Sequence, residues 1–270
     1  MNRIDFALVI TAHNCNPNGD PLNGNRPRQT YDGYGEMSGV CIKRKIRDVL
    51  ALNGEKILVM PEIAIKDRVE ECVAVAKAMK AKDPTVLRRA ACREWMDVRS
   101  FGQIFPFRGS DSSSGVRGPV TISDARSLSE IEIVTSEITR VCNLDATGKR
   151  ESSTMGAQYK VPAAVYVAFG GIFPQLAEIN NFSDNDTQKI KHAMANLFSA
   201  DATASRPSGT MTSTLFWWTH ETASGKASPA RVHNALHLME QDSYPYFSWR
   251  VDPIEGVSLE VLGENSNPST

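Results

Sequence analysis

The stretch Ile4-Asp-Phe-Ala-Leu-Val-Ile-Thr-Ala12 is almost continuously apolar and has the length of one buried strand. Its apolar side chains divide between two faces, with Ile4, Phe6, Leu8 and Ile10 on one face and Ala7 and Val9 on the other. Because both faces are apolar, we expect this stretch to be buried and to start the central sheet of the protein.

The segment that follows, residues 13–39, is rich in residues that oppose regular structure: five glycines, three prolines and five asparagines. We expect a long, non-helical loop, and loops of this length are usually functional or disordered. Ser38 then supplies an N-cap for a helix that we expect to continue to about Leu52 and to stop at Asn53-Gly54.

One face of this helix is apolar and another is cationic. The apolar stripe consists of Ile42, Ile46, Val49 and Leu50. Lys43, Arg44 and Arg47 project from the opposite side, with Lys45 beside them. With the loop segments Asn16-Pro-Asn-Gly-Asp-Pro21 and Asn25-Arg-Pro-Arg28, they indicate a local site for a polyanion. Four bases on a helix face are also often merely solvated, and this alternative stays open.

The rest of the chain predicts an α+β fold. We expect helices within residues 61–82, 85–96 and 183–198, strands within 120–142, 161–172 and 211–220, and a Gly/Ser-rich loop at 101–119. That loop lacks the Gly-Lys-Ser/Thr ending of a nucleotide-binding P-loop. With the helical insertion set aside, the order β-α-β-β-α-β is the ferredoxin-like arrangement of RRM-type RNA binders, although the aromatic RRM signatures are missing.

Composition limits the classes of protein that fit. Thirty basic and 31 acidic residues leave a net charge of −1, so any nucleic-acid site must be local. From Glu221 onward there are seven acidic and three basic residues. The five cysteines include no CxxC pair, which indicates reduced thiols. Since neither a signal peptide nor an apolar stretch of bilayer length is seen, we expect a cytoplasmic protein with no membrane partner.

Catalytic and metal-binding patterns are weak. His233-Asn-Ala-Leu-His237 lacks the glutamate of the HExxH motif, His13 and Cys15 lack a second ligand pair, and no Ser/His/Asp set is identifiable. We therefore expect no catalytic residue, metal or cofactor. Phe216, Trp217 and Trp218 are either base-stacking platforms or core residues with a subunit contact, and three bulky residues in one strand favour the core.

Several segments together resemble one known family. They are Asn16-Pro-Asn-Gly-Asp-Pro21 with Asn25-Arg-Pro-Arg28, Cys41-Ile-Lys-Arg-Lys-Ile-Arg47, Asp97-Val-Arg-Ser-Phe-Gly102, Gly118-Pro-Val with Ala125-Arg-Ser127, Ile138-Thr-Arg140, and Met155-Gly with Val161-Pro to Tyr166. In this order, over residues 3–220, they are similar to the repeating backbone subunit of CRISPR-associated Cascade complexes, type I-C, of the RAMP superfamily.

The resemblance implies a hand-shaped, single elaborated domain over residues 1–270. Its RRM/ferredoxin-like palm would hold about residues 3–53 and 97–220, with a helical finger insertion at about 55–96. A β-hairpin thumb would lie at about 143–160, and residues 221–270 would form a C-terminal segment.

The resemblance also implies a non-catalytic subunit that polymerises along the spacer of a CRISPR RNA. Its partners would be that RNA, copies of itself in a helical filament, other Cascade subunits, and target DNA that pairs with the guide in antiviral defence. Each thumb would flip out one base at regular intervals and leave short guide segments free to pair.

The residues expected to contact RNA are cations, one N-cap and one apolar wedge. They are Arg26, Arg28, Ser38, Lys43, Arg44, Arg47, Arg99, Arg117, Arg140, Met155 and Lys160. Met155, between Thr154 and Gly156, suits a base-flipping wedge. For Arg99, Arg117 and Arg140 the alternative is a structural ion pair. Lys149, Arg150 and Lys160 would steady the strand at the base of the arm, and for Lys149 and Arg150 the alternative is a disordered, merely solvated loop.

The rival function is a metal-dependent endoribonuclease that acts on target RNA. Related backbone subunits of type III complexes cut with an acidic residue in the loop after the first strand. Asp20 and Asp32 lie in the corresponding loop here. The matched segments are those of the type I group, so we favour a scaffold over a nuclease.

Overall fold

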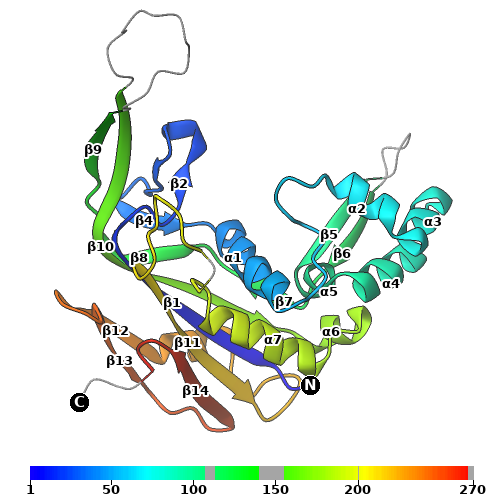
Figure 1. Ribbon diagram of the computed structural model, residues 1–270. Helices are drawn as coiled ribbons and strands as arrows, with labels where there is room; N and C mark the ends of the chain where they lie inside the picture. Colours follow the sequence, from blue (N-terminus) through cyan, green and yellow to red (C-terminus); the bar gives the residue numbers. More distant parts are fainter. Residues whose placement is uncertain (107–112, 140–154, 200, 267–270) are drawn as a thin grey trace, which may run out of the picture.

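A computed structural model of the chain describes residues 1–106, 113–139, 155–199 and 201–266. Its central sheet has the order β14-β11-β1-β10-β8-β4, and β7 and β9 pair with other parts of β10 (Figure 1). All of these pairings are antiparallel. The strands are β1 (Ile4–Cys15), β4 (Tyr34–Met37), β7 (Val120–Ile122), β8 (Ala125–Glu130), β9 (Val134–Thr139), β10 (Met155–Ile172), β11 (Met211–His220) and β14 (Val257–Gly263).

Strand β1 lies at the centre of the sheet, between β10 and β11. Ile10 is opposite Tyr166 on one side and Ser213 on the other. Residues 4–12 are all buried, which confirms the predicted strand and extends it to Cys15. The alternation of large and small side chains places the large ones against helices and the small ones against a second layer, so both faces of β1 are covered.

Helices α1 (Gly39–Leu52), α6 (Pro174–Asn180) and α7 (Asp184–Ala195) contribute to the layer on the first face. The Ser38 hydroxyl accepts a hydrogen bond from the amide of Cys41, and α1 ends at Leu52, as predicted. Ser183 and Asp186 form a capping box at the start of α7. That helix ends at Ala195, a little before the predicted position.

The second face of the sheet is covered by α8 (Pro229–Asn234) and a hairpin of β12 (Leu236–Glu240) and β13 (Phe247–Val251). Phe216 and Trp218 pack with Phe247 in this layer, and Trp217 packs in the first layer. All three aromatic residues of β11 are buried, which confirms that they belong to the core. Strand β14 pairs with the outer edge of β11 and was not among the predicted strands, so the strand predicted within 211–220 is not the last strand of the sheet.

A helical block follows α1 and has its own apolar core. It contains α2 (Ile65–Glu71), α3 (Val73–Ala81), α4 (Pro84–Glu94), α5 (Met96–Phe101) and the hairpin of β5 (Gly102–Pro106) and β6 (Ser113–Arg117). The single helix predicted within 61–82 is wrong, because Cys72 is extended and separates two helices. In the described part of residues 101–119 the predicted loop is also wrong, because most of these residues form the paired strands β5 and β6, whose Phe105 and Val116 belong to the core of the block.

The loop after β1 contains more regular structure than predicted. Strands β2 (Gly19–Asp20) and β3 (Arg26–Pro27) pair around a 3-10 turn, η1 (Pro21–Asn23). Farther along the chain, β9 and the start of β10 form a two-stranded arm that rises from the sheet beside β2 (Figure 1). The predicted thumb at about 143–160 falls mostly outside the described residues.

No helix in the described ranges has the length and hydropathy needed to cross a membrane.

Candidate nucleic-acid interface

The arm of β9 and β10 and the helical block stand on opposite sides of α1 (Figure 1). Most of the predicted RNA-contacting residues lie on the elements between them. The side chains of these residues fall into two small groups, one at the base of the arm and one beside the β5–β6 hairpin.

The first group joins the loop after β1 to the arm. The guanidinium carbon of Arg26 lies 4.6 Å from the centroid of the Tyr159 ring, a cation–π contact between β3 and β10. The side-chain amide of Asn16 donates to the carbonyl of Asn25 at 2.7 Å and holds the turn before β3 in place. Lys160 follows Tyr159, so its side chain lies on the opposite face of the strand and is not brought to Arg26.

Arg28 lies near these residues but already has an acidic neighbour. Its guanidinium is 3.6 Å from a carboxylate oxygen of Asp20, and both side chains are about one-third exposed. The buried Nε of Arg28 has no hydrogen-bond partner in the described part of the chain. The Arg28 guanidinium is therefore only partly engaged by protein groups.

The N-terminus of α1 offers less to an anion than predicted. Asp124 accepts a hydrogen bond from the amide of Gly39 at 2.7 Å, and the Asn18 side chain accepts one from the amide of Ser38 at 2.9 Å. The Ser38 hydroxyl accepts from Cys41. The amides of Ser38, Gly39 and Cys41 are thus satisfied within the protein, and Asp124 already supplies the negative charge that a helix N-terminus favours.

Three of the four α1 cations are paired with carboxylates. Arg44 pairs with Asp48 at 2.8 Å on the surface, and Lys45 is buried and pairs with Asp201. Arg47 is also largely buried, 2.9 Å from Asp97. The prediction that Arg47 projects into solvent is wrong, because α5 brings Asp97 against that side of α1.

Lys43 remains the exception on α1. No carboxylate lies within 4.0 Å of its ammonium among the described residues. Burial, and then the positive charge of Arg47, lower the pKa of Lys43. Its ammonium lies 5.7 Å from the centroid of the Phe101 ring. A half-buried cation without an acidic partner is suited to an anionic ligand.

Lys43 and Arg117 line one open groove of about 760 Å³. The groove runs between α1, the β5–β6 hairpin and β7, and its other lining residues are Phe101, Gly102, Gln103, Ile104, Gly115, Val116, Gly118, Val120, Thr121 and Ile122. Arg117 is exposed at its edge. The second group of cations therefore faces a shared hollow that has glycines along its wall.

The remaining predicted residues have different positions. Arg99 is 2.8 Å from Asp186 and 3.8 Å from Glu55, so it makes the structural ion pairs that were the alternative for it. Arg140 lies outside the described residues. Met155 is described in its backbone alone, opposite Thr139 in the arm.

The acidic residues of the nuclease alternative are separately engaged. Asp20 accepts a hydrogen bond from the amide of Leu22, and Asp32 pairs with Arg126. The hydrogen bond from the Thr30 hydroxyl, with that from Arg126, lowers the pKa of Asp32. Within the described ranges, no group of three or more His, Cys, Asp or Glu side chains is placed to hold a metal ion.

His233 and His237 do not form a pair. His233 lies on α8 and stacks on Phe169, with 4.7 Å between ring centroids. His237 lies on β12, 2.8 Å from Asp252. Since α8 ends before His237, the spacing that places two histidines on one helical face does not apply.

One buried polar network was missed by the sequence analysis. The Asp5 carboxylate lies 2.7 Å from Nε2 of His220 and 3.0 Å from the guanidinium of Arg3. Nδ1 of His220 accepts a hydrogen bond from the amide of Lys226. The sequence feature that points to this network is Asp5, an acidic residue within the otherwise apolar stretch 4–12. The network ties β1 to the end of β11, away from α1.

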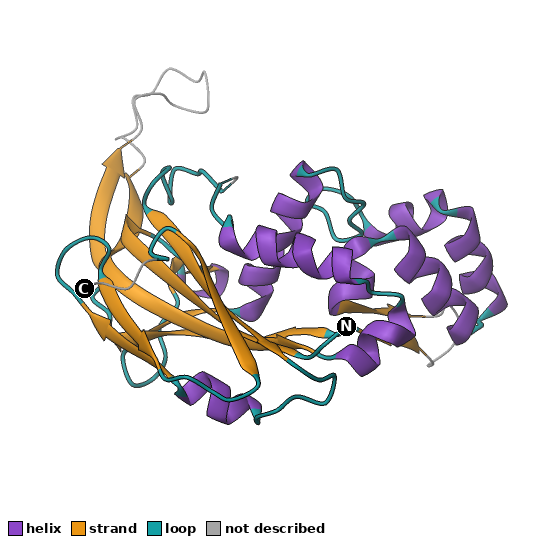
Figure 2. Ribbon diagram, turned by 90° about the horizontal axis from the view of Figure 1, so that it is seen from below, coloured by secondary structure: helices purple, strands orange, loops and turns teal. Residues whose placement is uncertain are grey.

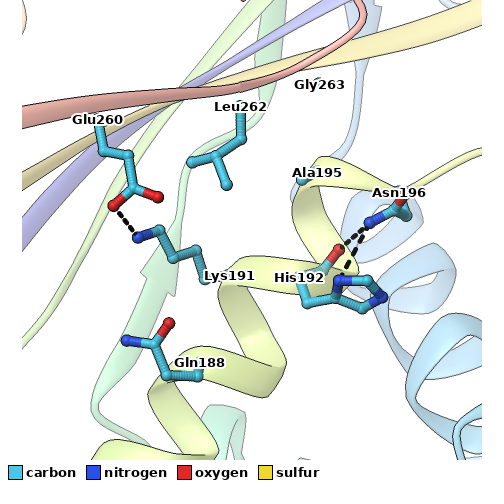
Figure 3. Close-up of a pocket in the computed structure, with 8 residues that line it drawn as sticks. All are labelled: Gln188, Lys191, His192, Ala195, Asn196, Glu260, Leu262 and Gly263. Carbon is cyan, nitrogen blue, oxygen red and sulfur yellow. Dashed lines mark hydrogen bonds and ion pairs between the residues drawn. The ribbon is translucent and has the colours of Figure 1, made fainter.

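A smaller hollow of about 330 Å³ lies between α7 and β14 (Figure 3). Its charged residues are paired across it, Lys191 with Glu260. The Lys191 ammonium also lies 5.5 Å from the ring centroid of Trp217. We assign this hollow a structural role in fastening β14 to α7.

A family model and a curated relative indicate the same family. The family described as CRISPR-associated protein Cas7 matches residues 2–251. A protein of Haloferax volcanii described as CRISPR-associated protein Cas7 is 27% identical over 215 residues, which cover 70% of this chain. The chain spans 62% of the length of that relative. A solved chain of a complex described as "CRISPR RNA-guided surveillance complex, pre-nicking" has a TM-score of 0.52 and 14% identity, with 81% of this chain and 78% of that chain covered. At this identity, the likeness concerns the fold alone.

Proposed function

The chain belongs to the CRISPR-associated Cas7 family, and from this premise we propose that it is a CRISPR RNA-binding backbone subunit of a type I Cascade surveillance complex. The observation that carries the proposal is the groove shared by Lys43 and Arg117 between α1 and the helical block. Among the described residues, neither Lys43 nor Arg117 has a carboxylate within 4.0 Å, and two such cations beside a wall that contains glycines suit the phosphates of a strand whose sequence is not read.

We interpret the sheet and its first helical layer as an RRM-like palm. The order β11-β1-β10-β8, with α1 following β1 and α6 and α7 following β10, supports this interpretation. In this protein α8 and the β12–β13 hairpin cover the second face of the sheet, and the aromatic residues Phe216 and Trp218 on that face are buried. RNA would therefore cross the α1 side of the molecule rather than the sheet face that RRM domains use.

The fingers would be the helical block and the thumb would be the arm of β9 and β10 with the segment between them. Arg26 on Tyr159 would hold the loop after β1 against the base of the thumb. Met155 would begin the wedge that flips one base, and Arg140 would steady the strand there. Arg28, Lys160 and Arg44 would add phosphate contacts at the edges of the path.

Three residues take revised roles in this proposal. Arg47 and Arg99 position the helical block, because their guanidinium groups are held by buried or nearly buried carboxylates. Ser38 orders the start of α1, because its hydroxyl accepts from the helix itself. Each would shape the RNA path without touching a phosphate.

In the complete assembly, copies of the chain would polymerise along the spacer and leave guide segments free to pair with target DNA. Other Cascade subunits would cap the filament, and the complex would act in antiviral defence in the cytoplasm. A non-catalytic role is favoured because Asp20 and Asp32 are separately engaged by protein groups. A metal-dependent ribonuclease remains the second candidate function, because these two acidic residues lie in the loop after β1.

RNA binding at different salt concentrations tests the proposal. We expect Lys43→Ala combined with Arg117→Ala to weaken binding to single-stranded RNA and to reduce the slope of log K against log salt by about 1.4, or about 0.7 per phosphate contact. The control is Arg231→Ala combined with Arg250→Ala, two exposed cations of the C-terminal segment. Equal affinities and slopes for the two double variants would overturn the groove as the RNA site.

The nuclease candidate needs a separate assay. The assembled protein and guide RNA are incubated with complementary RNA and Mg²⁺. We expect the complementary RNA to stay intact. Regularly spaced cuts that disappear with Asp32→Ala would replace the scaffold with the ribonuclease.

A further inference from the structure

An exposed stripe on α3 combines one apolar residue with two cations. Val73, Lys77 and Lys80 lie at spacings that place them on one face of the helix. Val73 is 79% exposed, and both lysines are exposed. This face of α3 therefore points away from the core of the helical block.

Helix α4 repeats the pattern with Val86, Arg89 and Arg93. Val86 is 49% exposed and both arginines are exposed. Lys82, between the helices, and Arg88 add two more cations. We call these eight residues the basic face: Val73, Lys77, Lys80, Lys82, Val86, Arg88, Arg89 and Arg93.

The charge of the basic face is not neutralised within the described chain. No carboxylate lies within 4.0 Å of any of its six cations there. The single acid of residues 72–93 is Asp83, and its carboxylate accepts the amides of Thr85 and Val86 as the N-cap of α4. In contrast, α1 pairs three of its four cations.

A complementary surface lies at the tip of the β12–β13 hairpin. Met239 and Tyr244 are each 60% exposed there, beside the exposed carboxylates of Glu240 and Asp242. The Tyr244 hydroxyl donates to Glu264, which follows β14, at 3.4 Å. We call these five residues the acidic tip. No basic side chain lies within 4.0 Å of its three carboxylates in the described ranges.

The two surfaces lie at opposite ends of the molecule. Figure 1 places α3 and α4 at one end and β12 and β13 at the other. In Figure 2 the strands gather at the end that carries the C-terminus and most helices gather at the other. One copy therefore cannot satisfy its own surfaces. Contact between different surfaces of two copies is heterologous, and repetition of such a contact builds an open filament unless the rotation closes a ring.

We propose that the basic face of one copy docks on the acidic tip of the next copy. This inference rests on the proposed polymer and assigns its contact surfaces. The exposed valines decide between a protein and a nucleic acid as occupant, because an apolar side chain contributes nothing to a phosphate contact. With Met239 and Tyr244 on the other surface, Val73 on α3 and Val86 on α4 each add an exposed apolar contact beside the cations of their own helix, and protein interfaces combine such apolar and charged contacts.

Charge reversal tests the pairing directly. Lys80→Glu with Arg89→Glu makes the basic-face variant, and Glu240→Lys with Asp242→Lys makes the acidic-tip variant. We expect each variant alone to stay monomeric at low salt, measured by sedimentation without RNA. A one-to-one mixture should associate, because each variant then presents the charge that the other lacks. Failure of the mixture to associate overturns the proposal, as does wild-type assembly by either variant alone.

A short RNA that accommodates a single copy separates this result from the proposed function. We expect both variants to bind it with the affinity of the wild-type chain. If the basic-face variant loses this binding and the mixture does not associate, the basic face binds nucleic acid and the interface is overturned. If no form of the protein binds the RNA, the proposed function fails, while the sedimentation result still decides the interface. Unchanged thermal unfolding of both variants verifies that each is folded.

Discussion

The guanidinium of Arg47 lies 2.9 Å from the carboxylate of Asp97, fifty residues farther along the chain. The Asp97 side chain is only 1% exposed and also accepts hydrogen bonds from the amides of Leu58 and Val59. One carboxylate thus joins α1, the start of the helical block and α5. This contact fixes how the block stands beside the proposed RNA groove.

We expect Asp97→Ala to destabilise the protein by about 3–5 kcal/mol, because it leaves a largely buried guanidinium and two amides without their acceptor. The measurement is the free energy of unfolding in urea. The matched control is Asp48→Ala, which removes the surface partner of Arg44 and should cost less than about 0.5 kcal/mol. Similar losses for the two variants would contradict a special role for Asp97.

Local signals made β1 and α1 predictable. The apolar stretch 4–12 and the cap at Ser38 each act within a few residues, so the structure confirms both. The burial of Arg47 depends on Asp97, and no local pattern indicates that pair. Lys43 and Arg44 lie off the apolar stripe of α1 as predicted, but Lys45 is buried against Asp201 and Arg47 is largely buried against Asp97, and both aspartates come from residues far along the chain.

The C-terminal segment contains a local pattern that is typical of a strand. Val257-Ser-Leu-Glu-Val-Leu-Gly263 contains alternating apolar residues, and it forms β14 at the edge of the sheet. The same segment also contains α8, β12 and β13, which cover the second face of the sheet. This role is visible only in the fold, because it depends on Phe216 and Trp218 of β11, which are distant in sequence from the residues that cover them.

Lys43→Met should separate stability from RNA binding. Burial and the neighbouring Arg47 lower the pKa of Lys43, so the charged ammonium is disfavoured in the free protein. Replacement by an apolar side chain of similar length should leave the free energy of unfolding unchanged or raise it, while RNA affinity falls. Urea unfolding and RNA titration measure the two effects. Lys43→Arg is the control and should keep RNA binding. A loss of both stability and binding in Lys43→Met would indicate a structural role.

Asp186 should contribute to the loss of stability in acid. Burial favours its protonated form, but hydrogen bonds from Arg99 and Ser183 outweigh burial and lower the pKa of Asp186. A carboxylate whose pKa is lowered by folding stabilises the folded state at pH values above its unfolded-state pKa of about 3.9. This contribution is lost as the pH falls through the pKa of the folded state. Asp186→Asn should therefore be less stable than wild type at neutral pH and approach it below about pH 4.

Urea unfolding from about pH 7 down to about pH 3 measures this effect. The control is Asp67→Asn, which changes an exposed aspartate on α2 and should follow the wild-type curve. A constant difference between Asp186→Asn and wild type across the whole range would exclude the Asp186 carboxylate as the source of the pH dependence.

The contact between Arg26 and Tyr159 should matter more for RNA binding than for folding. Its geometry is that of a cation–π pair near the surface, which contributes about 0.5–1 kcal/mol. Tyr159→Ala should therefore lower the free energy of unfolding only slightly, yet it should weaken RNA binding because the loop after β1 is no longer held against the arm. Tyr159→Phe keeps the aromatic ring and should bind RNA as wild type does. Equal losses of RNA affinity in both variants would assign the effect to the Tyr159 hydroxyl and contradict the proposed link between the loop and the arm.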